Sequence, residues 1–163
     1  HFYVNFLKDE DKLKEIAEKL TDYDSDTHIG LIHPIKIGTI CAAKFDVDNN
    51  WYRAKVEKSI YDQETGDHMY EVYFIDYGNK NDVKIENLKK IDSELTVYPP
   101  LAHQCKLAFI NVPKADKTFG PEAADYFKEK LWGKVCTISI YDEDDVSFKV
   151  VINEGKELKV NES

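Results

Sequence analysis

The sequence predicts a mostly β fold with helices, in which a small β-barrel is inserted into a second β-barrel formed by the two flanks of the chain. Short runs rich in β-branched and aromatic residues, separated by turn residues, fill the middle of the chain. One amphipathic helix pattern precedes them, and another helix pattern with further strand patterns follows. Because the elements on either side are too few to bury a core alone, we expect the flanks to combine.

Composition and charge limit the classes of function. The chain has 163 residues, of which 42 % are hydrophobic and 33 % charged, as in a globular protein with one sizeable core or a small inserted module. No stretch approaches the roughly 20 consecutive apolar residues that span a bilayer, so we expect no membrane segment. The net charge of -9 argues against a general phosphate-binding surface and favours a cationic partner. The start at His1, without Met or a basic leader, suggests a fragment of a longer protein.

The cysteines and histidines predict neither disulfides nor a metal site. Cys41, Cys105 and Cys136 are odd in number, widely spaced and set in apolar surroundings. We interpret them as buried, reduced thiols, which places the protein in the cytoplasm, the nucleus or both. The five histidines show no metal-ligand spacing with one another or with the cysteines. We therefore expect no bound metal and no cofactor.

Residues 1–34 are predicted to supply a strand, a helix and a linker to the flanking barrel. Phe2-Tyr3-Val4 is typical of a short strand. Residues 9–20 form a helix pattern, because Leu13, Ile16, Ala17 and Leu20 recur at i, i+3, i+4 and i+7. Residues 23–34 are polar, with a glycine and a proline, and we interpret them as the linker.

Residues 35–97 are predicted to form the inserted barrel. Its strands are separated by turn residues at close spacing, which is typical of small, strongly bent antiparallel barrels. The predicted strands are residues 39–45, 51–61, 70–76, 81–85 and a short run after Leu88.

Residues 98–163 are predicted to complete the flanking barrel. A strand pattern covers residues 102–112, and Gly120-Pro121 opens a helix pattern that reaches about residue 132. Residues 135–141 and 146–152 then form a predicted hairpin with an acidic turn between them.

An aromatic run from Glu71 to Asn79 is the strongest candidate for a binding site. Its strand ends at a hairpin corner, because Gly78 and Asn79 tolerate positive φ. Phe45 and Tyr52 flank a short turn, and we expect their rings to lie near this corner with those of Phe74 and Tyr77. From residue types alone, the rings form either a closed core or a cage around a cation. Asn79 as a polar contact and nearby carboxylates favour the cage; these acids are Asp46, Asp48, Asp76 and Asp82.

Three motifs resemble the signature of Tudor domains. They are Lys44-Phe45, Trp51-Tyr52-Arg53-Ala54-Lys55-Val56 and Val72-Tyr73-Phe74-Ile75-Asp76-Tyr77-Gly78-Asn79. The first strand and helix, together with the later strand from residue 102, resemble the flanks of an extended Tudor domain. Nearly the whole chain is similar to the C-terminal part of the Tudor staphylococcal nuclease family, in which the Tudor barrel is inserted into a staphylococcal-nuclease-like OB fold.

The resemblance implies a non-catalytic reader of symmetrically dimethylated arginine in Arg-Gly-rich protein tails, such as those of spliceosomal Sm-type or Piwi-type proteins. It also implies an adaptor role within an RNA-processing or RNA-regulatory protein. The cage it implies consists of Phe45, Tyr52, Phe74 and Tyr77, with Asn79 as the polar contact. Phe74 stands where many family members carry Tyr, so the ring is kept and a hydroxyl is lost.

The roles of three further residues follow less directly. Asp76 either supports the charge of the ligand or caps the turn, and both alternatives stay open. Trp51 and Arg53 are expected to pack and pair on the exterior of the barrel.

Phosphodiester cleavage, RNA binding and calcium binding are the alternatives to methylarginine recognition. Phosphodiester cleavage needs cationic side chains for its transition state, and Arg53 is the only arginine, so we expect no catalysis by this fragment. Any nuclease activity would lie in upstream domains. Single-stranded RNA binding by the OB-like part is the alternative function, through a basic face of Lys84, Lys89, Lys90, Lys128, Lys130 and Lys134. An EF-hand-like spacing from Asp46 to Glu57 is better explained as a hairpin turn, because Trp51 occupies the required glycine position.

Overall fold

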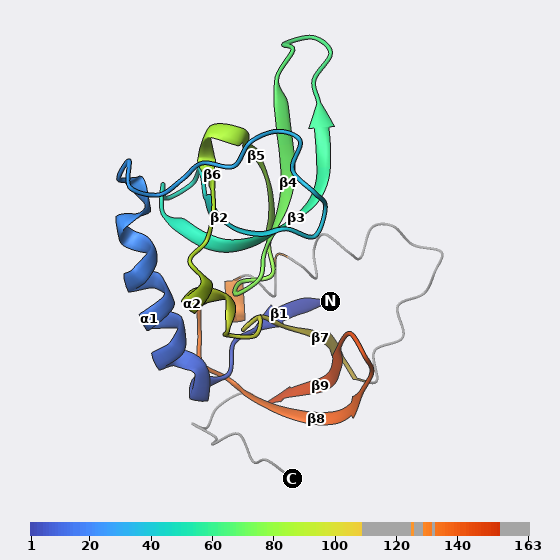
Figure 1. The fold of residues 1–163 in the computed structure, drawn as a ribbon. Coiled ribbons are helices and arrows are strands. Elements are labelled where there is room, and N and C mark those ends of the chain that lie inside the picture. The colour runs from blue at the N-terminus through green and yellow to red at the C-terminus, as the bar shows by residue number, and fades with distance from the viewer. Residues whose placement is uncertain (109–124, 126–128, 132, 154–163) are drawn as a thin grey trace. The chain divides into compact units, whose positions relative to one another are not determined.

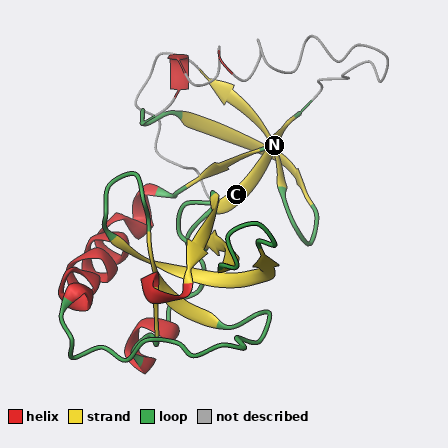
Figure 2. Cartoon of the chain, turned by 90° about the horizontal axis from the view of Figure 1, so that it is seen from above, coloured by secondary structure: helices red, strands yellow, loops and turns green. Residues whose placement is uncertain are grey.

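The mostly β architecture is confirmed by the computed structural model, which describes residues 1–108, 125, 129–131 and 133–153 (Figures 1 and 2). Contacts divide the chain into two compact units, Phe2–His103 and Gln104–Ser163, the latter with His1. How the chain divides into an inserted barrel and two flanks, at residues 1–34, 35–97 and 98–163, stays a prediction.

The unit Phe2–His103 holds most of the regular structure. Its helix α1 confirms the predicted amphipathic helix, and its central strands agree closely with the predicted runs. The elements are β1 (Phe2–Val4), α1 (Glu10–Leu20), β2 (Ile40–Lys44), β3 (Trp51–Tyr61), β4 (His68–Phe74), β5 (Lys80–Lys84), β6 (Leu88–Lys89) and the short helix α2 (Ser93–Thr96).

The central sheet is an antiparallel, barrel-like sheet of five strands in the order β5-β4-β3-β2-β6. Cys41, Ala54 and Phe74 form one row across β2, β3 and β4. Tyr52, which pairs with Ala43, lies two residues before Ala54 on the same face of β3. The register shifts between Val56 and Lys58, a bulge that increases the local twist and helps the sheet to bend. Tyr52 is therefore a diagonal neighbour of Phe74, which places aromatic side chains from separate strands beside one another.

The predicted linker is fixed to the edge of this sheet. The N–H of Leu31 donates to the carbonyl of Leu88 at 2.9 Å, and the N–H of Lys90 donates to the carbonyl of Ile29 at 2.8 Å. These backbone bonds extend the pairing beyond β6 without forming a long strand. The segment therefore covers an edge that would otherwise expose unpaired backbone groups.

Two hydrophobic clusters lie on opposite faces of the sheet, as the period-two alternation of strands requires. On β2, Cys41 and Ala43 join the inner cluster, whereas Ala42 joins the outer one. The inner cluster is Ile35, Cys41, Ala43, Ala54, Val56, Tyr70, Val72, Phe74, Val83 and Leu88. The outer cluster, which includes residues of α1, is Ile16, Leu20, Tyr23, Ala42, Trp51, Leu95 and Leu101.

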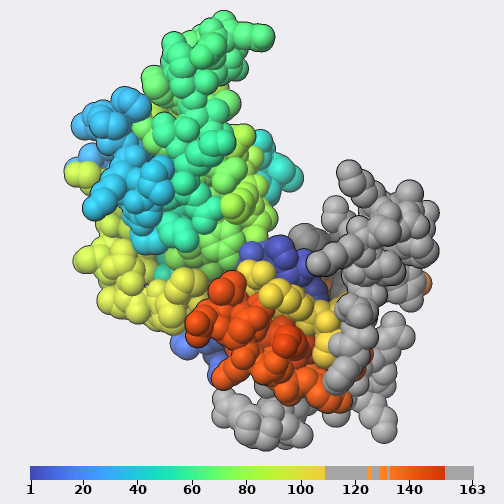
Figure 3. All heavy atoms as spheres, turned by 90° about the vertical axis from the view of Figure 1, so that its right-hand side faces the viewer, coloured from blue at the N-terminus to red at the C-terminus, as the bar shows by residue number. Residues whose placement is uncertain are grey.

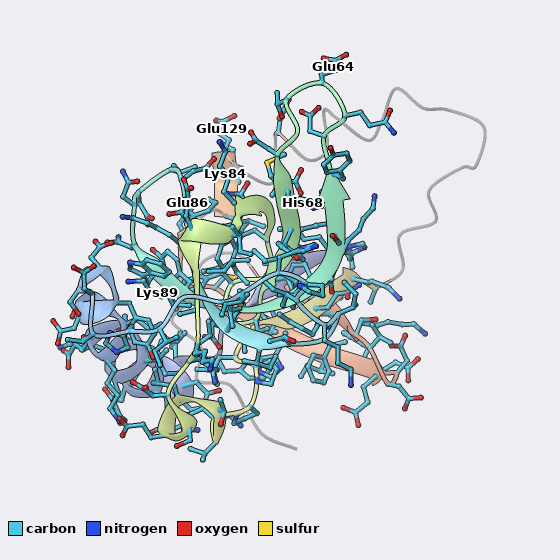
Figure 4. All side chains as sticks on the ribbon, turned by 45° about the horizontal axis from the view of Figure 1, so that its top comes forward. Glu64, His68, Lys84, Glu86, Lys89 and Glu129 are labelled. Atoms are coloured by element: carbon cyan, nitrogen blue, oxygen red, sulfur yellow. The ribbon has the colours of Figure 1, made fainter. Side chains whose placement is uncertain are left out.

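The β3–β4 hairpin extends beyond the other strands of its sheet, and its tip stands out from the surface (Figures 1 and 3). Glu64 lies at this tip, beyond His68 at the start of β4 (Figure 4). Tyr61 and His68 pair across the hairpin with ring centroids 4.7 Å apart. The aromatic contacts of the hairpin end are thus separate from those at the Phe74 end of β4.

The second unit contains β8 (Thr137–Glu143), β9 (Phe148–Asn153) and, from Gln104 on, β7 (His103–Leu107). β9 pairs in parallel with β7 and antiparallel with β8, which confirms the predicted hairpin. Its turn lies later than predicted, because Asp144 accepts the N–H groups of Val146 and Ser147 and so closes the turn there. The predicted helix over residues 120–132 lies largely outside the described residues.

Strand β4 is shorter at its end than predicted. It stops at Phe74, and Ile75, Asp76 and Tyr77 form a turn rather than the last residues of the strand. The N–H groups of Tyr77 and Gly78 both donate to the carbonyl of Phe74, at 3.1 and 2.8 Å. We call residues 75–79 the cage turn, because Tyr77 and Asn79 lie in it.

Gly78 is required in the cage turn for two reasons. Its φ of +86° lies in the left-handed region. A Cβ atom at this position would also lie 2.1 Å from Cγ of Tyr3. The ring of Tyr3, in β1, therefore packs directly on the backbone of the turn.

None of the helices in the described part of the chain combines the length and the apolar character needed to cross a bilayer.

The contact between Gly78 and Tyr3 can be tested with alanine. Gly66, at the hairpin tip, is the matched control, because its φ is +75° and a Cβ there meets nothing within 4 Å. We expect Gly66→Ala to reduce the free energy of unfolding by about 1 kcal/mol from backbone strain alone. Gly78→Ala should cost about 2 to 4 kcal/mol, since overlap with the ring adds to the strain. Urea unfolding measures both, and equal costs would contradict the packing of Tyr3 on the turn.

Candidate functional site

Four aromatic rings from β3, β4 and the loops beside them meet at one end of the sheet. Phe45, Tyr52 and Phe74 lie mutually near-perpendicular, with interplanar angles of 74° to 80° and ring centroids 5.4 to 6.3 Å apart. Tyr77 joins through Tyr52, at 5.1 Å and 80°. We call these four residues the aromatic cluster. The structure thus brings together all four predicted cage rings; their role in methylarginine binding stays a prediction.

The four rings differ in exposure. Phe74 is only 1 % exposed and belongs to the inner core, whereas Phe45 and Tyr52 are half-buried against that core. Tyr77 is 45 % exposed. Phe74 therefore forms the base of the cluster rather than an open wall. Among the described residues, no direct ring contact joins Phe45 to Tyr77, which both lie beside Tyr52.

Asn79 lies at the end of the cage turn and is exposed. Its carbonyl accepts the N–H of Phe74 at 2.9 Å, which fixes the position of its backbone beside the base of the cluster. Its side-chain amide forms no hydrogen bond with other residues in the part of the chain that the structure describes. That amide is therefore free to contact a ligand, either as a donor or as an acceptor.

Behind the cage turn lies a buried ion pair between Arg53 and Asp76. Nε and Nη2 of Arg53 donate to the two carboxylate oxygens of Asp76 at 2.8 and 2.6 Å. The remaining N–H groups donate to the carbonyls of Leu95, Tyr98 and Pro99 at 2.8 to 2.9 Å. All five guanidinium donors thus have acceptors, which is the condition for a buried charge to be tolerated.

This ion pair corrects the expectation for Asp76. Its carboxylate, with the residue only 2 % exposed, is bound to Arg53 and also accepts the N–H of Leu101 at 3.2 Å. Its carboxylate is therefore taken up by the buried pair, so it neither caps the turn nor stands free to support the charge of a ligand. The reason is that β4 ends at Phe74: alternation along a continued strand would have placed Asp76 on the same face as Phe74, whereas the turn directs its carboxylate to Arg53.

Trp51 and Arg53 both lie on the outer face of the sheet, as expected for packing and pairing outside the barrel. Trp51 packs in the outer cluster, and its Nε1 donates to Asp24 at 2.9 Å. Arg53 is fully buried although it lies outside the barrel, because residues 95–99 fold over it. Each residue thus fixes the sheet to a segment outside the barrel strands.

The N-terminal segment also holds the cage turn. Nδ2 of Asn5 donates to the carbonyls of Asp76 and Leu101 at 2.9 and 2.8 Å. The N–H of Ala102 donates to the carbonyl of Ile75 at 3.2 Å. Sequence reasoning missed Tyr3 and Asn5, because contacts across more than 70 residues leave no periodic pattern.

The charge near the cluster is negative. The hydroxyl of Tyr52 donates to Asp48, and burial together with this hydrogen bond raises the pKa of Tyr52 from its ordinary value of 10.0 to about 12. Burial, and then the charges of Asp76 and Asp48, also raise the pKa of Tyr77. Both phenols are therefore neutral at physiological pH. The negative charge of Asp48 beside them favours a cation at this position.

The β2–β3 loop has the geometry of a turn and not of a calcium loop. Asp48 accepts the N–H of Asn50 at 3.0 Å, and Asp46 accepts from Nδ2 of Asn81 at 2.9 Å. Glu57 lies within β3 and pairs with Lys80. Among the described residues, no group of three or more His, Cys, Asp or Glu side chains is arranged to hold a metal ion.

The lysines of the alternative RNA-binding face have mostly local partners. Lys84 pairs with Asp67 at 3.4 Å, and Lys130 with Glu129 at 3.6 Å. Lys89 donates to the carbonyls of Tyr23 and Ser25 (Figure 4 labels Lys84 and Lys89). Lys128 lies outside the described residues. The RNA-binding face therefore stays a prediction without a geometric feature that favours it.

Comparison with known proteins identifies the same type of domain. Residues 1–109 match the Tudor domain family. The chain is 36 % identical over 158 residues to "Ribonuclease TUDOR 1" of Arabidopsis thaliana, which covers 94 % of this chain and 16 % of that protein. It is 33 % identical over 150 residues to human "RING finger protein 17", covering 89 % of this chain and 9 % of that protein. The chain thus spans less than a fifth of the length of these relatives.

Solved structures give the same result. The human TDRD1 extended Tudor domain, in complex with a symmetrically dimethylated E2F peptide, has a TM-score of 0.75 at 30 % identity, covering 92 % of this chain and 71 % of that one. The extended Tudor domain of Drosophila melanogaster Tudor-SN has a TM-score of 0.81 at 25 % identity, covering 95 % of this chain and 70 % of that one.

The buried ion pair behind the turn should dominate the stability of its unit. Arg53→Lys keeps the positive charge but replaces five fixed donors by three on one atom, so Asp76 and the carbonyls of residues 95–99 lose partners. We expect the free energy of unfolding to fall by about 3 to 5 kcal/mol. Lys44→Met, which breaks the exposed Lys44–Asp24 pair, is the control and should cost under about 1 kcal/mol. If chemical unfolding shows a similar loss of free energy for Arg53→Lys and Lys44→Met, the buried ion pair does not dominate the stability of the unit.

The raised pKa of Tyr52 predicts how stability depends on alkaline pH. Because the folded pKa of about 12 exceeds the ordinary value of 10.0, the stabilisation is complete below pH 10 and is lost as pH rises through 12. Thermal unfolding at pH 9 to 12 should therefore show a smaller decrease in Tm for Tyr52→Phe than for the unmodified chain. A decrease of the same size in both would show that Tyr52 titrates normally.

Proposed function

Since this chain belongs to the Tudor domain family and has the extended Tudor fold, we propose that it is a non-catalytic reader of symmetrically dimethylated arginine in Arg-Gly-rich peptides. The aromatic cluster is the proposed site, with Asn79 as its polar contact. Solved relatives support the proposal, because two TDRD1 domains of the same fold are bound to dimethylated peptides of E2F and MILI.

The observation that carries the proposal is the arrangement of the rings around Tyr52. Phe45 and Tyr77 both lie beside Tyr52, and Phe74 closes the base beneath them. A flat guanidinium then enters between Phe45 and Tyr77. Each ring face contributes about 0.5 to 2 kcal/mol to holding a cation, so several rings give micromolar affinity after association costs.

Methylation suits this site for physical reasons. Methyl groups replace N–H donors and spread apolar surface over the guanidinium, which lowers the free-energy cost of removing it from water. The N–H groups that remain need an acceptor, which the amide oxygen of Asn79 supplies. Unmodified arginine would leave more donors without partners between the rings and therefore binds less well.

The wider role follows from the family and is likewise a proposal. We propose that the chain is the extended Tudor part of a Tudor staphylococcal nuclease protein, which binds Sm-type or Piwi-type tails as an adaptor in RNA processing. The 25 % identity to Drosophila Tudor-SN supports this placement. Cysteines that stay reduced agree with a cytoplasmic or nuclear location; burial raises the pKa of Cys41 to about 12, which keeps it an unreactive thiol.

Calorimetric titration tests the site. Arg-Gly peptides carrying unmodified, symmetrically dimethylated or asymmetrically dimethylated arginine are titrated into the 163-residue chain. We expect the symmetric form to bind with micromolar Kd and the unmodified form several-fold more weakly. Tyr77→Ala should weaken binding roughly 2- to 30-fold, since it removes one ring face that is already exposed and leaves the core intact.

Tyr61→Ala is the matched control for that experiment. Tyr61 is 56 % exposed and lies at the opposite end of β3, so its loss should leave Kd unchanged. Phe74→Ala is a poorer probe, because emptying a site that is 1 % exposed costs about 3 to 5 kcal/mol of stability. Equal affinity for unmodified and methylated peptides, or equal effects of Tyr77→Ala and Tyr61→Ala, would refute the proposal.

A further inference from the structure

The β2–β3 loop holds one carboxylate directly against the aromatic cluster. Asp48 accepts the hydroxyl hydrogen of Tyr52 with Oδ2 and the N–H of Asn50 with Oδ1. The loop itself is closed by backbone bonds between Phe45 and Asn50 and between Asn49 and Phe45, at 2.9 and 2.8 Å. One oxygen of Asp48 is thus held by the loop and the other by a cluster residue of β3, so its charge has a defined position.

The charge of Asp48 reaches beyond its hydrogen-bond partner. Tyr77 lies 5.1 Å from Tyr52 between ring centroids. Its pKa is raised first by burial, then by the charges of Asp76 and Asp48. Asp48 is therefore close enough to act electrostatically on both tyrosines of the cluster.

Three other carboxylates near the cluster have side-chain partners of their own. Asp76 is paired with Arg53, and Glu57 with Lys80. Asp46 accepts from Asn81, on the side of the loop toward β5. Within the described part of the chain, the partners of Asp48 are a hydroxyl and a backbone N–H rather than a cation, and Asp48 alone of these acids holds a cluster ring.

We propose that Asp48 is the residue that makes this site selective for charge: its carboxylate draws a cation onto the rings and disfavours an uncharged ligand of the same shape. The inference rests on the function proposed above. Aromatic rings alone discriminate weakly, because they stack on neutral planar groups as well as on cations. A fixed full charge beside two of the rings adds an attraction that only a cation feels.

The test compares Asp48→Asn with Asp46→Asn. Both variants remove one negative charge from the same loop and keep a side-chain oxygen as an acceptor, but only Asp48 contacts a cluster ring. With a symmetrically dimethylated Arg-Gly peptide at low ionic strength, we expect Asp48→Asn to raise Kd roughly fivefold and Asp46→Asn by less than about twofold. At 0.5 M salt the difference between the variants should shrink.

A second peptide separates charge from shape. It carries Nω-methylcitrulline, an uncharged planar urea of similar outline, in place of dimethylarginine. Asp48→Asn should bind this neutral peptide as well as the unmodified chain does. The Kd for the neutral peptide divided by the Kd for the dimethylarginine peptide should therefore fall roughly fivefold. A role of Asp48 in shape alone would weaken both peptides equally and leave the ratio unchanged.

Each outcome decides the proposal. A fall in the ratio confined to Asp48→Asn supports it. An unchanged ratio, or an equal effect of Asp46→Asn, overturns it while leaving methylarginine recognition intact. If the unmodified chain does not prefer methylated to unmodified arginine, the proposed function fails, and the role of Asp48 fails with it.

Discussion

The buried contact between Arg53 and Asp76 is the constraint on which the rest of this unit depends. A guanidinium removed from water is tolerated only if every donor is satisfied. Here the acceptors are the carboxylate of Asp76, in the cage turn, and backbone carbonyls of residues 95–99. The pair therefore determines where three separate segments must lie. One of them carries Tyr77, so the position of an exposed ring follows from a charge buried behind it.

The site combines a rigid base with a more exposed ring. Phe74 belongs to the inner core and Phe45 and Tyr52 pack against it, so their positions are set by the same contacts that stabilise the sheet. Tyr77 sits on a turn, held by backbone bonds to Phe74 and by the side chain of Asn5. Such an arrangement limits the entropy that a ligand must remove on binding, because three of the four rings are already fixed.

Much of the fold and the membership of the aromatic cluster could be predicted from the sequence, because both depend on local patterns. The apolar spacing of α1 and the turn at Gly78 both depend on residues that are close together in the sequence. The role of Asp76 could not be predicted, since its partner Arg53 is 23 residues away and the deciding carbonyls belong to a segment without a pattern of its own. The hydrogen bond from Tyr52 to Asp48 spans only four residues, yet its geometry depends on how the loop closes.

The packing of Tyr3 on Gly78 has a consequence for how this domain can be divided. A fragment limited to the predicted barrel, residues 35–97, would retain all four rings and Asn79. It would lack the ring that covers the turn, the amide of Asn5, and the carbonyls of Tyr98 and Pro99 that complete Arg53. Residues on either side of the predicted barrel thus hold the aromatic cluster in place, so a fragment limited to residues 35–97 would keep the rings without the contacts that position them.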